Sequence, residues 1–87
     1  MINMHVIVAY DVEAKRTERF KKICQIYLIK IQNSVFEGDI DESQLMKLKD
    51  RLKEEIKEDE TVKIWITSKI LQTFQIGVVK SIEDGII

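Results

Sequence analysis

The chain has 87 residues, of which 45% are hydrophobic and 33% charged, with a formal net charge of −1. This length fits a single domain over residues 1–87, and the composition excludes a disordered or low-complexity chain. The charge argues against nonspecific coating of DNA, and a lone cysteine excludes an intramolecular disulfide or a cysteine-based zinc site. No apolar run reaches the about 20 residues that cross a bilayer, and we expect a cytoplasmic protein without a secretory leader or membrane contact.

The first third of the sequence predicts a strand followed by an amphipathic helix. Residues 5–11 form a run rich in β-branched and aromatic side chains, which is typical of a strand buried on both faces. Phe20, Ile23, Cys24 and Tyr27 then follow the spacing i, i+3, i+4, i+7 with lysines between them. This spacing predicts one apolar face of a helix over residues 14–27, and it places Cys24 in the core.

The middle of the sequence predicts two short strands and a second helix. Residues 28–36 are rich in strand-forming types but are interrupted at Asn33 and Ser34, which indicates a tight hairpin or a bulge. Asp41 and Gln44 have the spacing of a capping box, which marks the start of a helix. A stripe of apolar side chains continues that helix to about residue 58: Leu45, Leu48, Leu52 and Ile56.

The last third predicts strands. Residues 62–66 alternate, so Val62, Ile64 and Ile66 face one side and Lys63 and Trp65 the other. Residues 74–79 predict a further strand. The order β-α-β-β-α-β with an extra C-terminal strand indicates a ferredoxin-like α+β sandwich.

Such a sandwich covers only one face of its sheet with helices, so the other face is expected to be bare. Its candidate residues are Ile7, Ala9, Trp65 and either Val35 or Phe36. A bare apolar face on so small a domain predicts association, most simply a twofold homodimer. We expect Phe36 and Trp65 at that interface.

Asp11 is the first candidate for chemistry, because it ends the first strand just before the first helix. Two interpretations are open: a helix N-cap or a metal ligand. One carboxylate is a weak metal site, since Mg²⁺ commonly uses one or two carboxylates with waters and substrate phosphate. A twofold axis through the bare face would bring two copies of Asp11 together, and they would repel unless a cation joined them.

The positive charges are the second candidate. Residues 1–33 carry six basic and three acidic groups, whereas residues 34–60 carry five basic and ten acidic groups. Two ends of opposite charge suit two different partners, although solvated charges on two helices are the commoner cause of such a distribution. Arg16 and Arg19 have the i, i+3 spacing of a phosphate clamp, and Ser34 can donate to phosphate or simply form a turn.

Several of these segments resemble one family. Residues 8–12, Val-Ala-Tyr-Asp-Val, resemble the opening strand of the CRISPR-associated protein two family, which ends in Tyr-Asp. Arg16 and Arg19 match the arginines that follow it, and Lys30 stands where arginine is common. Residues 31–37 resemble the family's Gln-x-Ser-Val-Phe-Glu motif, residues 59–65 its Asp-x-Val-x-Ile-aromatic strand, and residues 84–87 its C-terminal end.

The resemblance implies a ferredoxin-like homodimer of CRISPR adaptation that bridges two integrase dimers and helps hold foreign duplex DNA. It also implies a Mg²⁺-dependent endonuclease, chiefly an endoribonuclease on single-stranded RNA. Asp11 of each protomer would then be catalytic and would hold one Mg²⁺ shared at the dimer interface. Arg16, Arg19, Lys30 and Ser34 would position the nucleic acid. The alternatives are a scaffold without nuclease activity and a ribonuclease toxin of the virulence-associated protein D type.

Overall fold

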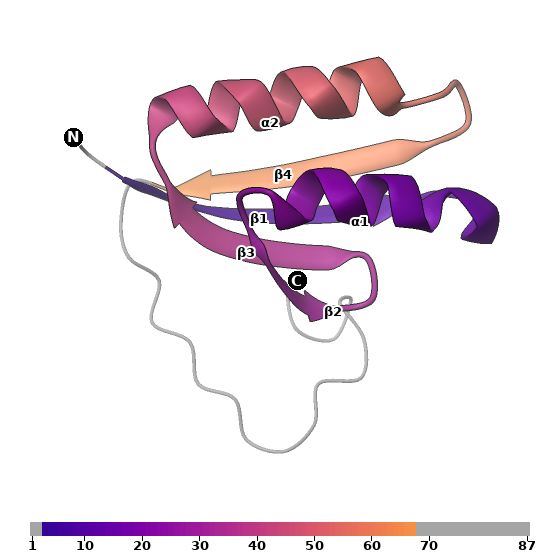
Figure 1. Cartoon of the computed structure of the whole chain (residues 1–87), viewed down its shortest axis with the longest axis horizontal. Coiled ribbons are helices and arrows are strands. Elements are labelled where there is room, and N and C mark those ends of the chain that lie inside the picture. The colour runs from indigo at the N-terminus through magenta and orange to yellow at the C-terminus, as the bar shows by residue number, and fades with distance from the viewer. Residues whose placement is uncertain (1–2, 68–87) are drawn as a thin grey trace.

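The computed structural model describes residues 3–67 (Figure 1). The strand expected over residues 74–79 lies outside the described residues. The elements in chain order are β1 (Met4–Asp11), the short 3-10 helix η1 (Ala14–Arg16), α1 (Thr17–Gln25), β2 (Ile29–Gln32), β3 (Val35–Ile40), α2 (Glu42–Glu55) and β4 (Thr61–Thr67).

The four described strands form one sheet in the order β2-β3-β1-β4, and all neighbours are antiparallel. Both helices lie on the same side of this sheet, as Figure 1 shows. This arrangement is the ferredoxin-like α+β fold that the sequence predicted. Within residues 3–67, no helix is long and apolar enough to span a membrane.

The core lies between the sheet and the two helices. Val6 and Val8 of β1 point into it, as do Phe20 of α1 and Leu48 of α2, and all four side chains are fully buried. Val62 and Ile64 of β4 pack against the same cluster, which confirms the predicted alternation along this strand. Cys24 is buried in the core as expected.

The start of α2 and the β2–β3 hairpin also follow the sequence closely. The Asp41 carboxylate accepts from the backbone N–H of Gln44 at 2.8 Å, and the Gln44 side-chain oxygen accepts from the Asp41 N–H at 3.0 Å. The strands β2 and β3 turn at Asn33 and Ser34, and their register shifts between Lys30 and Gln32. The predicted capping box and the predicted hairpin with a bulge are both confirmed.

Both helices end earlier than the sequence predicted. The first segment begins as a 3-10 helix and continues as α1 only to Gln25, and α2 stops at Glu55. Ile56 follows in an extended conformation with ψ of 140°. Arg16 donates to the Glu55 carbonyl at 2.8 Å, so a contact from a distant segment satisfies the end of α2.

The prediction that Phe36 lies in a partner interface is wrong. Phe36 pairs with Val8 across the β1–β3 ladder, so it points toward the helices and is fully buried in the core. Its neighbour Val35 pairs with Ala9 and therefore lies on the face of the sheet opposite the helices, here called the open face. Strand alternation places these residues on the open face: His5, Ile7, Ala9, Asp11, Val35, Glu37, Asp39, Lys63 and Trp65.

Candidate functional site

Asp11 is exposed at the end of β1, where it pairs with Thr61 of β4. It points to the open face because its predecessor, Tyr10, points into the core. Within residues 3–67, its carboxylate forms no hydrogen bond or ion pair. The N-cap interpretation is wrong, since Glu13 precedes η1 and its side chain forms no cap bond either.

A cavity of about 730 Å³ lies beside Asp11 and is called the Asp11 cleft here. Residues 11–13, Lys15 and Arg16 line one side, and residues 57–60 from the loop between α2 and β4 line the other. None of residues 57–60 was among the site residues that the sequence predicted. The loop lies near Asp11 because β1 and β4 are antiparallel neighbours, so the end of β1 lies beside the start of β4.

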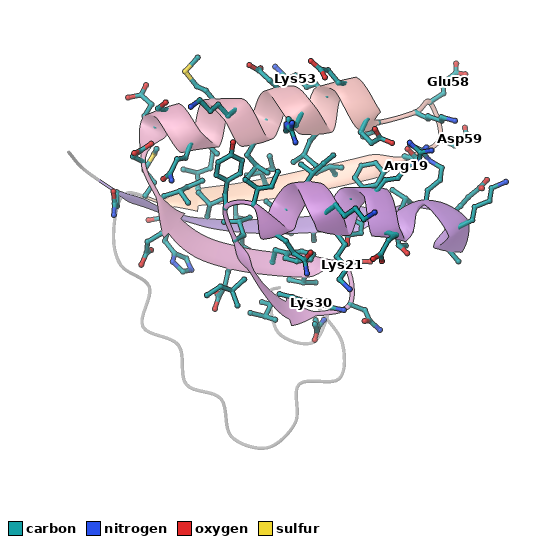
Figure 2. All side chains as sticks on the ribbon, viewed as in Figure 1. Arg19, Lys21, Lys30, Lys53, Glu58 and Asp59 are labelled. Carbon is teal, nitrogen blue, oxygen red and sulfur yellow. The ribbon has the colours of Figure 1, made fainter. Side chains whose placement is uncertain are left out.

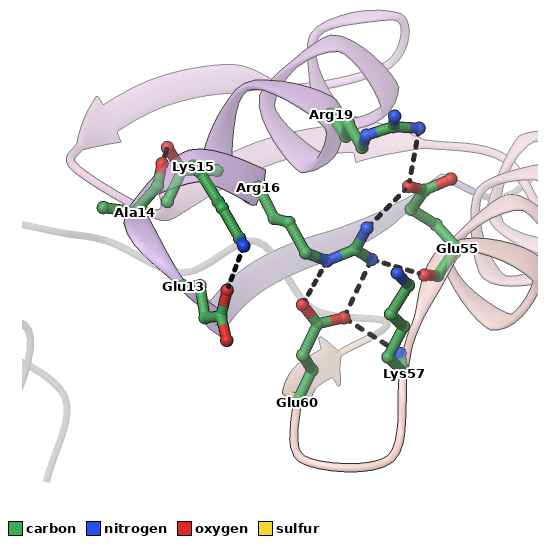
Figure 3. Close-up of polar contacts among 9 residues, drawn as sticks. Glu13, Ala14, Lys15, Arg16, Arg19, Glu55, Lys57 and Glu60 are labelled. Carbon is green, nitrogen blue, oxygen red and sulfur yellow. Dashed lines mark hydrogen bonds and ion pairs between the residues drawn. The ribbon is translucent and has the colours of Figure 1, made fainter.

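Arg16 ties the two sides of the Asp11 cleft together (Figure 3). Its Nε and Nη2 atoms donate to the two carboxylate oxygens of Glu60, with 3.0 Å for the Nη2 contact. Nη2 also donates to the Glu55 carbonyl, and the Glu60 carboxylate accepts from the backbone N–H of Lys57 at 2.9 Å. The Arg16 hydrogen bond lowers the pKa of Glu60.

The predicted phosphate clamp of Arg16 and Arg19 does not form. The Arg16 side chain is only 10% exposed and has internal partners, so it braces the fold instead of facing a ligand. Arg19 lies on α1 (Figure 2) and is 66% exposed. Its Nη1 lies 3.4 Å from a carboxylate oxygen of Glu55 (Figure 3). Only Arg19 of this pair is open to solvent and available to a nucleic acid.

Lys30 and Ser34 both line a second cavity, which lies beside Tyr10 and α1. This cavity has a volume of about 330 Å³ and is called the Tyr10 cavity here. The cavity also includes residues that the sequence interpretation did not assign to binding: Tyr10, Ala14, Thr17, Glu18, Lys21 and Asn33. The separation of Lys21 and Lys30 in sequence hid this grouping, which depends on how α1 packs over the β2–β3 hairpin.

Tyr10 is held firmly at this cavity. Its backbone N–H donates to the Ser34 carbonyl at 3.0 Å, and its ring lies against Phe20 and Phe36 with centroid distances of 5.3 and 6.1 Å. Burial is the main cause that raises the pKa of Tyr10 to about 12, while the Ser34 hydroxyl acts in the opposite direction. The phenol therefore remains protonated at neutral pH.

The open face carries charged and aromatic groups around a small apolar centre. The Lys63 ammonium lies over the Trp65 ring, 5.2 Å from its centroid. His5 lies between two carboxylates, with Nδ1 2.8 Å from Asp39 and Nε2 3.4 Å from Glu37. Trp65 is half-buried on this face, where a partner could contact it, and its interface role stays a prediction.

Asp11 is the candidate metal ligand of this chain. Within residues 3–67, no three histidine, cysteine or acidic side chains are grouped to hold a metal ion. Asp11 nevertheless offers an unpaired, exposed carboxylate, which is a ligand type that Mg²⁺ prefers. Two such carboxylates, with waters and a phosphate oxygen, are donors of the kind that Mg²⁺ takes, so the chemistry of Asp11 fits a shared ion.

Comparisons with known proteins agree on one family. Residues 4–73 match the family described as CRISPR associated protein Cas2. The "CRISPR-associated endoribonuclease Cas2 2" of Archaeoglobus fulgidus is 37% identical over 86 residues, which cover 99% of this chain and 92% of the relative. The "CRISPR-associated endoribonuclease Cas2" of Thermotoga maritima is 38% identical over 87 residues, which cover 97% and 99% of the two chains.

Solved structures extend this similarity to three dimensions. A Cas2 crystal structure with 44% sequence identity has a TM-score of 0.79 and covers 91% of this chain and 92% of its own. The crystal structure of Streptococcus pyogenes Cas2 at pH 6.5 is 27% identical, with a TM-score of 0.68 and coverage of 84% and 99%.

Proposed function

The chain belongs to the Cas2 family of CRISPR-associated proteins, and on this basis we propose that it is a Mg²⁺-dependent endoribonuclease that works as a homodimer. Its substrate class is single-stranded RNA, and Asp11 is the residue that holds the metal. The observation that carries the proposal is the exposed and unpaired Asp11 carboxylate, which lies on the open face at the rim of a cleft. Two relatives that span nearly the whole chain are named endoribonucleases, which supports the same activity.

The homodimer follows from the open face. Ile7 and Ala9 are partly exposed at its centre, where Val35 is buried, and Trp65 adds a half-buried aromatic side chain opposite Ile7. Contact between two such faces about a twofold axis would place a second Asp11 near the first. The two carboxylates would then repel each other, and a divalent cation between them removes that repulsion.

Different residues of the chain have different roles in the proposed reaction. When bound, Mg²⁺ stabilises negative charge on the phosphodiester and activates a water for attack. Asp11 holds the ion, while Arg19 and the lysines near α1 attract the phosphate backbone. Arg16 and Glu60 act indirectly, because their ion pair fixes the two loops that flank Asp11.

We also propose a role in CRISPR spacer acquisition, in which the dimer bridges two integrase dimers and helps bind foreign duplex DNA. The uneven charge favours such a scaffold: the segment with α1 is basic, and the segment with α2 is acidic. This role does not need cleavage, so it stands even if Asp11 is only structural. The Cas2 family match over residues 4–73 favours both CRISPR roles over a virulence-associated toxin.

Cleavage of labelled single-stranded RNA and duplex DNA tests the nuclease proposal. We compare wild type with Asp11→Asn, which removes the charge and keeps the side-chain shape, in Mg²⁺ and in chelator. Asp50→Asn is the matched control, since Asp50 is exposed on α2 outside both cavities. Light scattering reports whether each variant is still a dimer.

We expect RNA cleavage in Mg²⁺ that falls by at least about 100-fold in Asp11→Asn and in chelator, with Asp50→Asn unchanged. Cleavage that survives Asp11→Asn would remove the catalytic role of Asp11. Absence of cleavage by wild-type dimer would leave the scaffold role alone, and a monomeric wild type would overturn the shared metal site.

A further inference from the structure

We propose that the outer seam between α1 and α2, on the side of the sheet opposite the open face, binds the phosphate backbone of duplex DNA. Four basic residues define this helix seam: Arg19 and Lys22 of α1, and Lys47 and Arg51 of α2. The inference rests on the proposed scaffold role in spacer acquisition, and it assigns to that role a surface separate from Asp11.

The contact between Arg19 and Glu55 shows which sides of the two helices face each other. Arg19 is near the start of α1 and Glu55 is the last residue of α2, so the helices run in opposite directions (Figure 1). Arg51 and Lys47 precede Glu55 by four and eight residues, a spacing that places them on the same side of α2. Lys22 follows Arg19 by three residues and shares its side of α1.

The basic groups of the helix seam form a row. A helix rises about 1.5 Å per residue, so Arg51 lies about 6 Å along α2 from Glu55, and Lys22 lies about 4.5 Å along α1 from Arg19. Because the helices are antiparallel, Lys22 and Arg51 lie at nearly the same height. Lys47 continues the row by about another 6 Å toward the start of α2.

The cations in this row lack internal partners. Lys22, Lys47 and Arg51 are exposed, and among the described residues none of them forms an ion pair or a hydrogen bond. Lys47 and Arg51 have the i, i+4 spacing at which like charges repel and destabilise a helix. A polyanion along the helix seam removes this repulsion.

Carboxylates of α2 do not neutralise the row. Within the described structure, Glu55 is the one acidic side chain on this side of α2, and it already lies 3.6 Å from Arg16 and 3.4 Å from Arg19. Asp50 and Glu54 lie about 100° or more around the helix from Glu55, because each residue turns a helix by about 100°. The helix seam is therefore basic although the whole chain has a net charge of −1.

The positions of the aromatic rings favour duplex DNA over a single strand. Proteins that bind single strands stack bases on aromatic side chains. On the helix side of the described structure, Tyr10, Phe20 and Phe36 are buried, and Tyr27 packs against the same core. Trp65 lies on the open face. A row of cations without stacking groups contacts phosphates and carries no sequence preference.

The helix seam and Asp11 lie on different faces of the sheet. Both helices cover one side, whereas Asp11 points to the open face (Figure 1). In a homodimer joined through the open faces, the helix seam of each protomer points outward. Duplex DNA on the helix seam therefore leaves the proposed nuclease site free.

The test measures binding of a fluorescein-labelled duplex DNA of mixed sequence in chelator, over a range of salt concentrations. The test variant combines Lys47→Gln with Arg51→Gln. The matched control combines Lys49→Gln with Lys53→Gln and removes the same charge from the side of α2 that faces away from α1, where Figure 2 shows Lys53. For duplex DNA, each lost phosphate contact reduces the slope of log K against log salt by about 0.9.

We expect the test variant to bind at least about tenfold more weakly at about 0.15 M salt, with a slope lower by about 1.8, while the control keeps the wild-type slope. RNA cleavage in Mg²⁺ should be unchanged in both variants, since neither pair of residues lines the Asp11 cleft. The test variant should melt at no lower temperature than wild type, because its i, i+4 repulsion is gone. That result excludes misfolding as the cause of weaker binding.

Three results would overturn the inference. Equal weakening in the test variant and the control would show that only net charge matters. Wild-type affinity and slope in the test variant would remove the helix seam and leave the scaffold role standing. Binding of labelled polyglutamate but not of duplex DNA would assign the helix seam to an acidic protein segment. If wild type binds neither, the helix seam and the proposed DNA-binding role fail together.

Discussion

The Arg16 guanidinium contacts both carboxylate oxygens of Glu60, a residue 44 positions later in the chain. This two-point ion pair joins the first turn after β1 to the loop before β4 (Figure 3). These are the two segments that flank Asp11. The same guanidinium also satisfies the carbonyl of Glu55 at the end of α2. One arginine therefore fixes three parts of the chain around the proposed metal ligand.

The Arg16–Glu60 pair predicts a pH-dependent stability. The pKa of Glu60 is lowered mainly by the hydrogen bond from Arg16, so folding favours its ionised form. This contribution is complete above the ordinary glutamate pKa of about 4.5 and is lost as the pH falls through the lower folded-state pKa. Glu60→Gln should therefore have a lower melting temperature than wild type at pH 7, and the difference should shrink below about pH 4.5.

Thermal unfolding by circular dichroism from pH 7 to pH 3 measures this difference. Glu58→Gln, at an exposed residue of the same loop that forms no ion pair among the described residues, is the control and should follow wild type at every pH. A deficit of Glu60→Gln that stays constant to pH 3 would show that packing, and not ionisation, is responsible.

Leu48 is predicted to be essential for the core. It is fully buried between α2 and the sheet, so Leu48→Ala should lower the free energy of unfolding by about 2–5 kcal/mol. Met46 is 59% exposed on the same helix, and Met46→Ala should change this free energy by less than about 0.5 kcal/mol. Urea unfolding measures both values, and equal effects would contradict the placement of α2.

The capping box at the start of α2 predicts a smaller effect. Asp41→Ala removes the acceptor for the Gln44 N–H and should destabilise the protein by about 1 kcal/mol. Ser43→Ala, at an exposed position in the first turn, should have little effect. A double-mutant cycle with Gln44→Ala isolates the coupling, and a coupling near zero would mean that the two hydrogen bonds add nothing in solution.

Cys24 should be chemically inert in the folded protein. It is fully buried, and burial raises the pKa of its thiol to about 12, so almost no reactive thiolate exists at pH 8. Alkylation by iodoacetamide should be slow in the native state and fast in urea, as followed by mass spectrometry. Rapid alkylation of the native protein would place Cys24 at the surface.

Local patterns explain which features the sequence could predict. The alternation in residues 62–66 and the Asp41–Gln44 spacing each depend on neighbours within one element, so both appear directly in the sequence. The choice between Val35 and Phe36 depends on the register of the β1–β3 ladder. A one-residue change of register reverses the faces, and nothing in residues 31–37 alone fixes it.

For the site residues too, the sequence predicted local features but not contacts between distant segments. The position of Asp11 at a strand end was predictable, whereas the role of Arg16 depended on Glu60, a distant partner that one sequence does not reveal. The grouping of Lys21 with Lys30 also depended on helix packing. Both the i, i+3 spacing with Arg19 and the family resemblance predicted that Arg16 binds phosphate, whereas in the structure Arg16 pairs with Glu60 and has a structural role.

The antiparallel pairing of β1 with β4 has a consequence for synthesis of the protein. A ribosome makes β1, with Asp11, long before it makes Glu60 and the strand that pairs beside it. A nascent or truncated chain therefore carries the acidic residue without the cleft around it. The proposed nuclease site is therefore completed late in synthesis, when residues 57–60 and β4 join β1.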